Sequence, residues 1–184
     1  MSECKNEVIS SEIWHYNMGM EVGVDYIGIG VSLVCHDGQG RVLMNKRSRQ
    51  CRDEWGRWDH CGGKMEFGET PEECSCRELE EEYGCKPLEY RFGGVVNTIR
   101  NIKGHKTHWV ILAYLVQIDP EKAYNHEPAK FDELAWFEIN DLPPERHTFC
   151  DEDVKTIASA WTEFYGQAPE ITCLCSSTDR TAAS

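Results

Sequence analysis

The stretch that decides the fold covers residues 60–85 and reads HCGGKMEFGETPEECSCRELEEEYGC. Its central part carries the start signals of a helix, because Thr70 and Glu73 have the spacing of a capping box and a proline directly follows the threonine. Gly84 is a residue of the kind that ends helices in the left-handed conformation. The sequence therefore predicts a helix over residues 71–83.

The predicted helix has an unusual charge. Residues 66–85 contain eight glutamates and one arginine, a local charge of −7 in a chain whose net charge is −13. Glu78, Glu81 and Glu82 share one face of the helix, where like charges cost about 0.2–0.5 kcal/mol per pair. They also lie at the negative end of the helix dipole. A divalent cation would reverse this penalty, because clustered carboxylates are ligands that ions such as Mg²⁺ prefer.

The alternative interpretation is a solvated acidic helix face, which the glutamate spacing alone would favour. Three further features argue against it. Arg77 stands four residues before Glu81 and can hold a carboxylate in a fixed orientation. Gly62 and Gly63 place bare backbone beside the acidic cluster. Glu69 lies in the loop just before the helix, within reach of the same metal shell or of the first helical amides.

Residues 63–85 resemble the Nudix box, written G-x5-E-x7-R-E-U-x-E-E-x-G-U with U a bulky aliphatic residue. Only the last position departs, because Cys85 replaces the aliphatic residue, and cysteine packs as a small hydrophobe. The run ELAWFEINDLPP at 133–144 is also similar to a segment of many MutT-like members, so the resemblance covers about residues 22–145. The matching box positions are Gly63, Glu69, Arg77, Glu78, Leu79, Glu81, Glu82 and Gly84.

The resemblance implies an enzyme that hydrolyses the diphosphate linkage of nucleoside diphosphates joined to another group, using Mg²⁺ or Mn²⁺. It assigns metal binding to Glu78, Glu81 and Glu82, together with the carbonyl of Gly62. Such ions would polarise the phosphorus and lower the pKa of a bound water.

The resemblance assigns supporting roles to four other box residues. Arg77 orients a metal-binding glutamate, Glu69 supports the box through hydrogen bonds, and Gly63 and Gly84 support its backbone. These assignments predict that the box residues lie close together around the glycine-flanked cleft.

The general base is open between two sources. One is a box glutamate, Glu78 or Glu82, and the other is a carboxylate from a loop after the second hairpin. The first loop candidate is Glu127 in the run HEPAK, for which an exposed acid without a catalytic role is the ordinary alternative. Behind it stand Glu121, Asp132 and Glu133.

Two basic stretches flank the box. Residues 46–57 carry a net charge of +3 and residues 91–106 a net charge of +4. As groups they are suited to steer an anionic substrate toward the acidic helix, although a solvated surface is the ordinary role of each single side chain. Within them we expect Arg47, Arg57 and Arg100 to bind the substrate.

Other side chains have a structural interpretation as well as a functional one. His60 and His108 are predicted to be structural, because the box chemistry needs no histidine. Four aromatic residues can stack on a base, but core or rim positions are the ordinary alternative. These are Tyr26, Trp55, Phe92 and Trp136.

Two absences bear on the substrate. No proline occurs between Pro87 and Pro120, whereas the ADP-ribose branch of the family carries one about 16 residues beyond the box. Positions 101–103 also lack the tyrosine of the dinucleoside-polyphosphate branch. Both absences favour a MutT-like enzyme acting on nucleoside triphosphates. The alternatives are an ADP-ribose or nucleotide-sugar pyrophosphatase and a non-catalytic nucleotide-binding regulatory module.

Hydrophobic periodicity predicts strands at residues 27–35, 41–47, 89–99, 109–116 and 134–137, the first four paired as two hairpins. A final amphipathic helix is predicted over residues 151–165. We expect an α+β fold, a Nudix-like α/β/α sandwich with a mixed sheet. The domain covers residues 21–166, between an irregular lead-in at 1–20 and a flexible tail at 167–184.

Length and composition limit the other classes of function. The 184 residues fit one domain, and the longest strongly apolar run has eight residues, against about 20 for a membrane-spanning helix. The negative net charge argues against binding of double-stranded nucleic acid. The ten cysteines lack zinc-site spacing and the first residues do not resemble a signal peptide, which predicts free thiols in the cytoplasm. A nucleotide is the expected partner, and a homodimer is left open.

Overall fold

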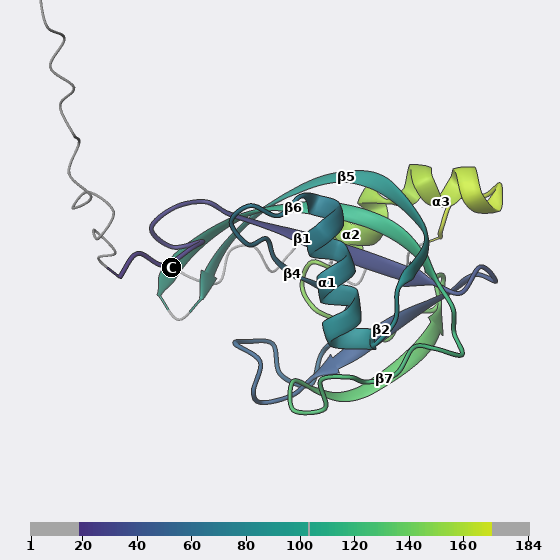
Figure 1. The fold of residues 1–184 in the computed structure, drawn as a ribbon, viewed down its shortest axis with the longest axis horizontal. Helices are drawn as coiled ribbons and strands as arrows, with labels where there is room; N and C mark the ends of the chain where they lie inside the picture. The colour runs from purple at the N-terminus through teal and green to yellow at the C-terminus, as the bar shows by residue number, and fades with distance from the viewer. Residues whose placement is uncertain (1–18, 103, 171–184) are drawn as a thin grey trace, which may run out of the picture.

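The computed structural model describes residues 19–102 and 104–170 (Figure 1). Its strands form one mixed sheet in the order β3-β2-β1-β6-β5, with β4 paired to β1 and β7 paired to β2. The strands are β1 (Gly28–His36), β2 (Arg41–Arg47), β3 (Trp58–Asp59), β4 (Cys61–Lys64), β5 (Pro87–Ile102), β6 (His105–Ile118) and β7 (Phe131–Glu138). The helices are α1 (Pro71–Tyr83), α2 (Cys150–Thr156) and α3 (Ala158–Tyr165).

Both predicted hairpins are confirmed. β1 pairs antiparallel with β2, and β5 pairs antiparallel with β6 along almost their whole length. The second hairpin is longer than predicted, because its strands continue to Ile102 and resume at His105. β1 also pairs in parallel with β6, from Gly28 opposite Trp109 to His36 opposite Gln117, which makes the sheet mixed.

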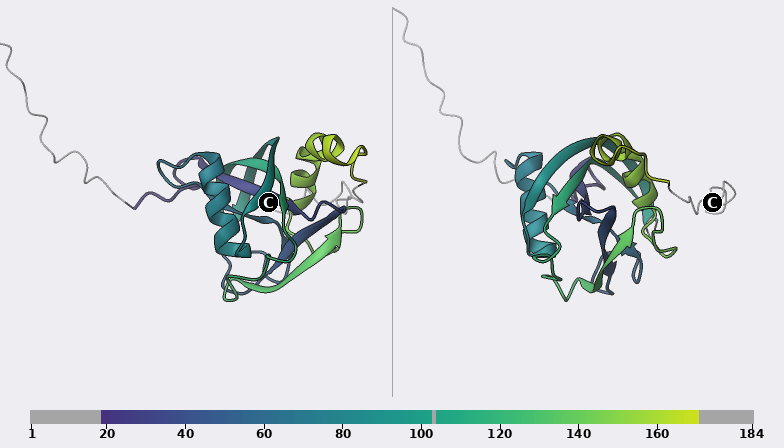
Figure 2. Two further views of the ribbon diagram at one scale, coloured as in Figure 1. Left: turned by 45° about the vertical axis from the view of Figure 1, so that its right-hand side comes forward. Right: turned by 90° about the vertical axis from the view of Figure 1, so that its right-hand side faces the viewer.

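Helices cover both faces of the sheet, as Figure 2 shows. Alternation along β1 divides its buried side chains: Leu33 packs in one core cluster with α1, and Val34 in the other with α2 and α3. A strand buried on both faces needs apolar residues at successive positions, as the sequence of β1 provides. The predicted α+β sandwich with a mixed sheet is confirmed.

The predicted box helix is confirmed as α1, with its caps. The amide of Glu73 donates to Thr70 Oγ1 at 3.2 Å, and the amide of Thr70 donates to Glu73 Oε2 at 2.8 Å. Gly84 closes the helix with φ 63° and donates to the carbonyl of Glu80. These caps fix both ends of the helix that carries the glutamates.

The predicted single helix over residues 151–165 is wrong in one respect, because it is divided into α2 and α3 at Ile157. This residue has φ −87° and ψ 1° and is fully buried. It packs on β5 where that strand has an irregular register, and a Cβ atom at Gly93 would lie 2.6 Å from Ile157 Cγ2. The break lets the chain pack closely on this bulge, a tertiary contact that helical periodicity does not encode.

The predicted lead-in and tail fall mainly on residues 1–18 and 171–184, which lie outside the described residues. At the start of the tail, the amide of Glu170 donates to Asn140 Oδ1 at 2.7 Å. The domain bounds therefore stay a prediction. Within the described residues, no helix is long and apolar enough to cross a membrane. All seven cysteines in this part of the chain are free thiols, as predicted for them.

Candidate active site

The centre of the site is the backbone of Gly62 and Gly63 in β4. The amide of Gly62 donates to Glu82 Oε2 at 3.2 Å. A Cβ atom at Gly63 would overlap the carboxylate of Glu78, and one at Gly62 would overlap the carbonyl oxygen of Val31. Gly63 therefore lets the buried carboxylate of Glu78 approach the backbone of β4, and Gly62 lets β4 approach β1 closely.

Arg77 holds the outer side of the acidic cluster. Its guanidinium donates to Glu69 Oε1 at 2.6 Å, to Glu78 Oε1 at 2.7 Å and to Glu81 Oε2 at 3.3 Å. It also donates to the carbonyl of Lys64 at 3.1 Å. The hydrogen bond from Arg77 lowers the pKa of Glu69 to about 2. One planar cation thus fixes three carboxylates relative to β4.

Glu82 is the most buried of the three glutamates, with 2% of its surface exposed. Burial raises its pKa to about 7, against the opposing effect of the nearby Lys130 ammonium. Lys130 Nζ donates to Glu82 Oε1 at 2.6 Å and to Glu127 Oε2 at 3.1 Å. Lys130 therefore connects the loop carboxylate of Glu127 to the box helix through two hydrogen bonds.

Backbone hydrogen bonds fasten the loop before β7 to the end of α1. The amide of Tyr124 donates to the carbonyl of Tyr83 at 3.0 Å, and the amide of His126 donates to that of Glu82 at 3.1 Å. On the other side, the amide of Ser48 donates to the carbonyl of Lys130 at 3.0 Å. These contacts satisfy helical carbonyls that would otherwise lack partners and set the position of Lys130.

The donor set fits a hard divalent cation in its chemistry, since carboxylate oxygens converge on exposed backbone. Among the described residues, however, no three His, Cys, Asp or Glu side chains form a group arranged to hold a metal ion. Two cations explain this separation: Arg77 draws Glu78 and Glu81, and Lys130 draws Glu82. Closing three glutamates around one ion requires these pairs to rearrange.

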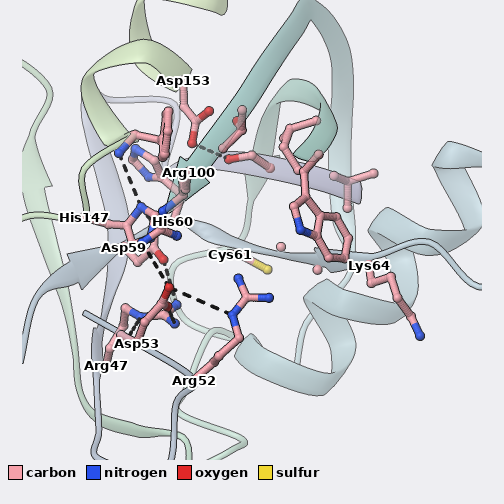
Figure 3. A pocket seen from close by; sticks show the side chains of 18 of the residues that line it. Arg47, Arg52, Asp53, Asp59, His60, Cys61, Lys64, Arg100, His147 and Asp153 are labelled. Atoms are coloured by element: carbon pink, nitrogen blue, oxygen red, sulfur yellow. Dashed lines mark hydrogen bonds and ion pairs between the residues drawn. The ribbon is translucent and has the colours of Figure 1, made fainter. Parts of the chain in front are cut away.

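A cavity of about 290 Å³ adjoins the other side of β4 (Figure 3). Cys61, Gly62 and Gly63 line it, so β4 separates the cavity from the α1 carboxylates. Strands β1, β5 and β6, residues of the segment 47–60 and the segment 147–153 supply the other walls. Asp153 enters from α2 and accepts a hydrogen bond of 2.8 Å from Ser32 Oγ.

Several buried polar atoms in this cavity lack partners in the described part of the chain. They include both ring nitrogens of His60, Thr107 Oγ1 and Trp109 Nε1. Burial lowers the pKa of His60 to about 4, so its ring is neutral at physiological pH. Burial also raises the pKa of Asp153 to about 7, against the effect of the Ser32 hydrogen bond. Buried polar atoms cost free energy when unpaired, so this cavity is suited to a polar ligand.

Ion pairs organise the cavity rim. Arg47 donates to Asp59 at 2.9 Å and to Asp53 at 3.1 Å. Arg100 lies 3.0 Å from Asp53 and 2.5 Å from Glu54. These contacts tie the segment between β2 and β3 to β5.

The three predicted substrate-binding arginines do not all line the cavity. Arg47 and Arg100 line the cavity, and each is paired with acids. Arg57 is half exposed, donates to the carbonyl of Arg146 and does not line the cavity. Of the aromatic candidates Tyr26, Trp55, Phe92 and Trp136, none lines it either.

The sequence alone did not identify Lys130 or Asp153 as site residues, and it did not predict that His60 lines the cavity. The run HEPAK was singled out for its glutamate, and its lysine could have been weighed as a partner for the acidic helix. Asp153 had no local signal, because it lies among other acids on a helix and only the fold carries it to Ser32.

Comparison with known families matches the NUDIX domain over residues 27–158. The match spans more than half of the sequence and includes both the box and the cavity walls. The chain belongs to the NUDIX family. Enzymes of this family generally use divalent metal ions, in agreement with the oxygen donors on α1.

Three individual proteins are similar to this chain. It is 33% identical over 108 residues to the oxidized purine nucleoside triphosphate hydrolase of Danio rerio, covering 56% of this chain and 62% of that curated relative. A crystal structure of a MutT NUDIX hydrolase from Burkholderia pseudomallei has a TM-score of 0.63 and 29% identity, over 71% of this chain and 97% of that one. A NUDIX hydrolase from Nitrosomonas europaea, at 17% identity and TM-score 0.58, shares the fold over 73% of this chain and 90% of that one.

Proposed function

We propose that this NUDIX protein is a metal-dependent pyrophosphohydrolase of nucleoside triphosphates, with Mg²⁺ as cofactor and Mn²⁺ as the alternative. The observation that carries the proposal is the convergence of Glu78 and Glu82 on Gly62–Gly63, directly beside a polar cavity. Nucleotides combine a polyanion and a neutral heterocycle, and the two sides of β4 supply one environment for each.

In this proposal Glu78, Glu81 and Glu82 hold the metal together with the carbonyl of Gly62. When bound, the ion supplies charge neutralisation of the phosphates and a water of lowered pKa. Arg77 keeps Glu78 and Glu81 in place, and the capped ends of α1 keep all three glutamates on one face. The capped helix thus fixes the backbone positions of the three glutamates before the substrate arrives, and only their side-chain ion pairs rearrange when the metal binds.

Activation of the attacking water is proposed for Glu82 or Glu78, with Glu127 as the third candidate. The carboxylate of Glu82 accepts a hydrogen bond from the Gly62 amide, beside the backbone that is proposed to hold the ion. Glu127 is about one-third exposed and reaches the same place through Lys130. Glu82 is therefore our first choice.

The cavity is proposed to bind the nucleoside. Its volume of about 290 Å³ is close to the lower limit of small-molecule pockets, and its unpartnered atoms are both donors and acceptors. Arg47 and Arg100 would contact the substrate from the cavity wall while paired with acids. Arg57, outside the cavity, is left with a steering role. The relative from Danio rerio, named as a hydrolase of oxidized purine nucleoside triphosphates, supports this choice of substrate.

We also propose that the protein works in the cytoplasm on small nucleotides rather than on double-stranded nucleic acid. The free thiols of the seven described cysteines support a reducing compartment. The net charge of −13 disfavours a duplex, which binds through surplus basic groups. A homodimer is one possible assembly, and light scattering would determine it.

The test is hydrolysis by the full chain with Mg²⁺ over nucleoside triphosphates, oxidised dGTP, ADP-ribose, nucleotide sugars, dinucleoside polyphosphates and capped RNA. We expect nucleoside triphosphates, normal or oxidised, to give the highest kcat/KM with release of pyrophosphate. Preference for ADP-ribose or a sugar nucleotide would overturn the substrate assignment. Binding of a nucleotide without any turnover would instead support a regulatory module and overturn the enzymatic proposal.

A further inference from the structure

Lys130 is the basic side chain that contacts the most deeply buried glutamate of the box. Its ammonium lies 2.6 Å from Glu82 Oε1 and 3.1 Å from Glu127 Oε2. Glu82 has 2% of its surface exposed, so an ionised carboxylate there needs a close positive partner. Arg77 pairs with the other two box glutamates, Glu78 and Glu81, whereas Glu82 pairs with Lys130.

The surroundings of Lys130 permit a change of partner. Its side chain is 38% exposed, whereas that of Glu82 is buried, so the lysine approaches from the solvent side. The backbone around it is fixed by Ser48 and by the end of α1. Glu127, three residues earlier in the same turn, offers a second carboxylate without any backbone movement.

A divalent ion and Lys130 compete for the same oxygen. The Oε2 atom of Glu82 already accepts from the Gly62 amide, and Oε1 accepts from Lys130. An ion bound to Glu82 and the Gly62–Gly63 backbone would place two positive groups within a few ångströms of each other, which is repulsive. This repulsion favours departure of the lysine from Glu82.

We propose that Lys130 is a displaceable counter-cation of the box: it holds Glu82 in the ion-free protein and moves to Glu127 when a divalent ion binds. This inference rests on the proposed function for its metal site. It makes Lys130 a positioning residue that keeps the ion-free cleft assembled and adjusts the metal affinity of the site.

The first test uses the wild-type chain without substrate. The protein is treated with an amine-acetylating reagent in EDTA or in saturating Mg²⁺, and acetylation of each lysine is followed by mass spectrometry. We expect Mg²⁺ to raise the acetylation rate of Lys130 severalfold. Lys122, in the same loop but exposed and paired with Asp119, serves as the internal control and should not change. An unchanged or slower rate at Lys130 would overturn the proposal.

The second test compares Lys130→Met, Lys130→Arg and the control Lys122→Met by thermal unfolding. In EDTA, Lys130→Met should lower Tm by about 5 °C, since one partner of a buried pair is lost. Saturating Mg²⁺ should remove at least half of this deficit, because the wild-type lysine has then left Glu82 as well. Lys130→Arg should behave as wild type in EDTA, and Lys122→Met in both conditions.

A deficit of Lys130→Met that is equal or larger in Mg²⁺ would show a purely structural residue and overturn the proposal. Both tests omit nucleotide, so they separate the two proposals. Displacement of Lys130 in a protein that hydrolyses no nucleotide would support this inference and contradict the proposed function. Hydrolysis without displacement would do the reverse.

Discussion

The two sides of β4 bury acids in opposite ways. On the α1 side, Glu82 meets an ammonium and a backbone amide, and its neighbours meet Arg77. On the cavity side, Asp153 accepts from the Ser32 hydroxyl and lines the same cavity as His60, whose ring nitrogens lack partners in the described part of the chain. Burial raises the pKa of both acids to about 7, yet within residues 19–102 and 104–170 only Glu82 of the two forms an ion pair.

This difference suits the two sides of β4 to different parts of a nucleotide. The carboxylates on the α1 side are balanced by Arg77 and Lys130, and under our proposal a metal ion takes the place of Lys130, which suits the phosphate chain of a nucleotide. The Asp153 carboxyl accepts from a neutral hydroxyl and is suited to hydrogen bonding with an uncharged heterocycle. The same strand therefore lies between the acidic cluster of α1 and a polar cavity whose rim arginines, Arg47 and Arg100, are paired with acids.

The substitution with the largest expected effect is Glu82→Gln, which tests the metal-binding role of the α1 side. The amide keeps the volume but cannot serve as an anionic ligand or base, so kcat with Mg²⁺ should fall by roughly 10²–10⁴-fold. Steady-state kinetics measures the loss, and circular dichroism verifies the fold. Glu80→Gln, an exposed residue of the same helix, is the matched control and should retain wild-type kcat. Full activity of Glu82→Gln would refute the assignment of the α1 side.

The substitution Asp153→Asn tests the cavity side of β4 through the pH dependence of stability. The folded-state pKa of Asp153 lies above its unfolded value, so the wild type loses stability as pH rises through about 7. The asparagine variant has no such charge to bury. Its stability relative to wild type should therefore grow by roughly 2 to 3 kcal/mol between pH 5 and pH 8.

Urea unfolding at several pH values checks this prediction. The charge of Asp59 on β3 also raises the pKa of Asp153, so Asp59 must remain unchanged in the variant. Glu145→Gln, exposed in the loop before α2, provides a control whose relative stability should not vary with pH. A pH-independent difference between Asp153→Asn and wild type would mean that Asp153 is not buried as a neutral acid.

The smallest expected effect concerns the scaffold of the α1 side alone. Thr70→Ala removes the side-chain acceptor of the capping box and should lower the free energy of unfolding by about 1 kcal/mol. Thr162→Ala, in the interior of α3 and exposed, should cause no loss, since alanine is the better helix former. Chemical denaturation compares the two. An equal loss in both variants would contradict the capping role.

Sequence reasoning succeeded where the relevant contacts are local. The box helix follows from Thr70, Glu73 and Gly84, which act on backbone within a few residues. The strand β1 follows from alternation of apolar residues over residues 27–35, and the strand β6 from the apolar run at 109–116. The prediction of a single final helix failed at Ile157, because a bulge in β5, more than sixty residues earlier, sets the position of the break.

The sequence by itself determined the family, the box helix and the acids that α1 presents, since a capped helix with fixed spacing puts them on one face whatever surrounds it. The tertiary structure decided which cation meets each acid and which acid enters the cavity. Lys130 reaches Glu82 across 48 positions and Asp153 reaches Ser32 across 121. Burial and ion pairing depend on distances through space, and no local pattern of residues encodes them.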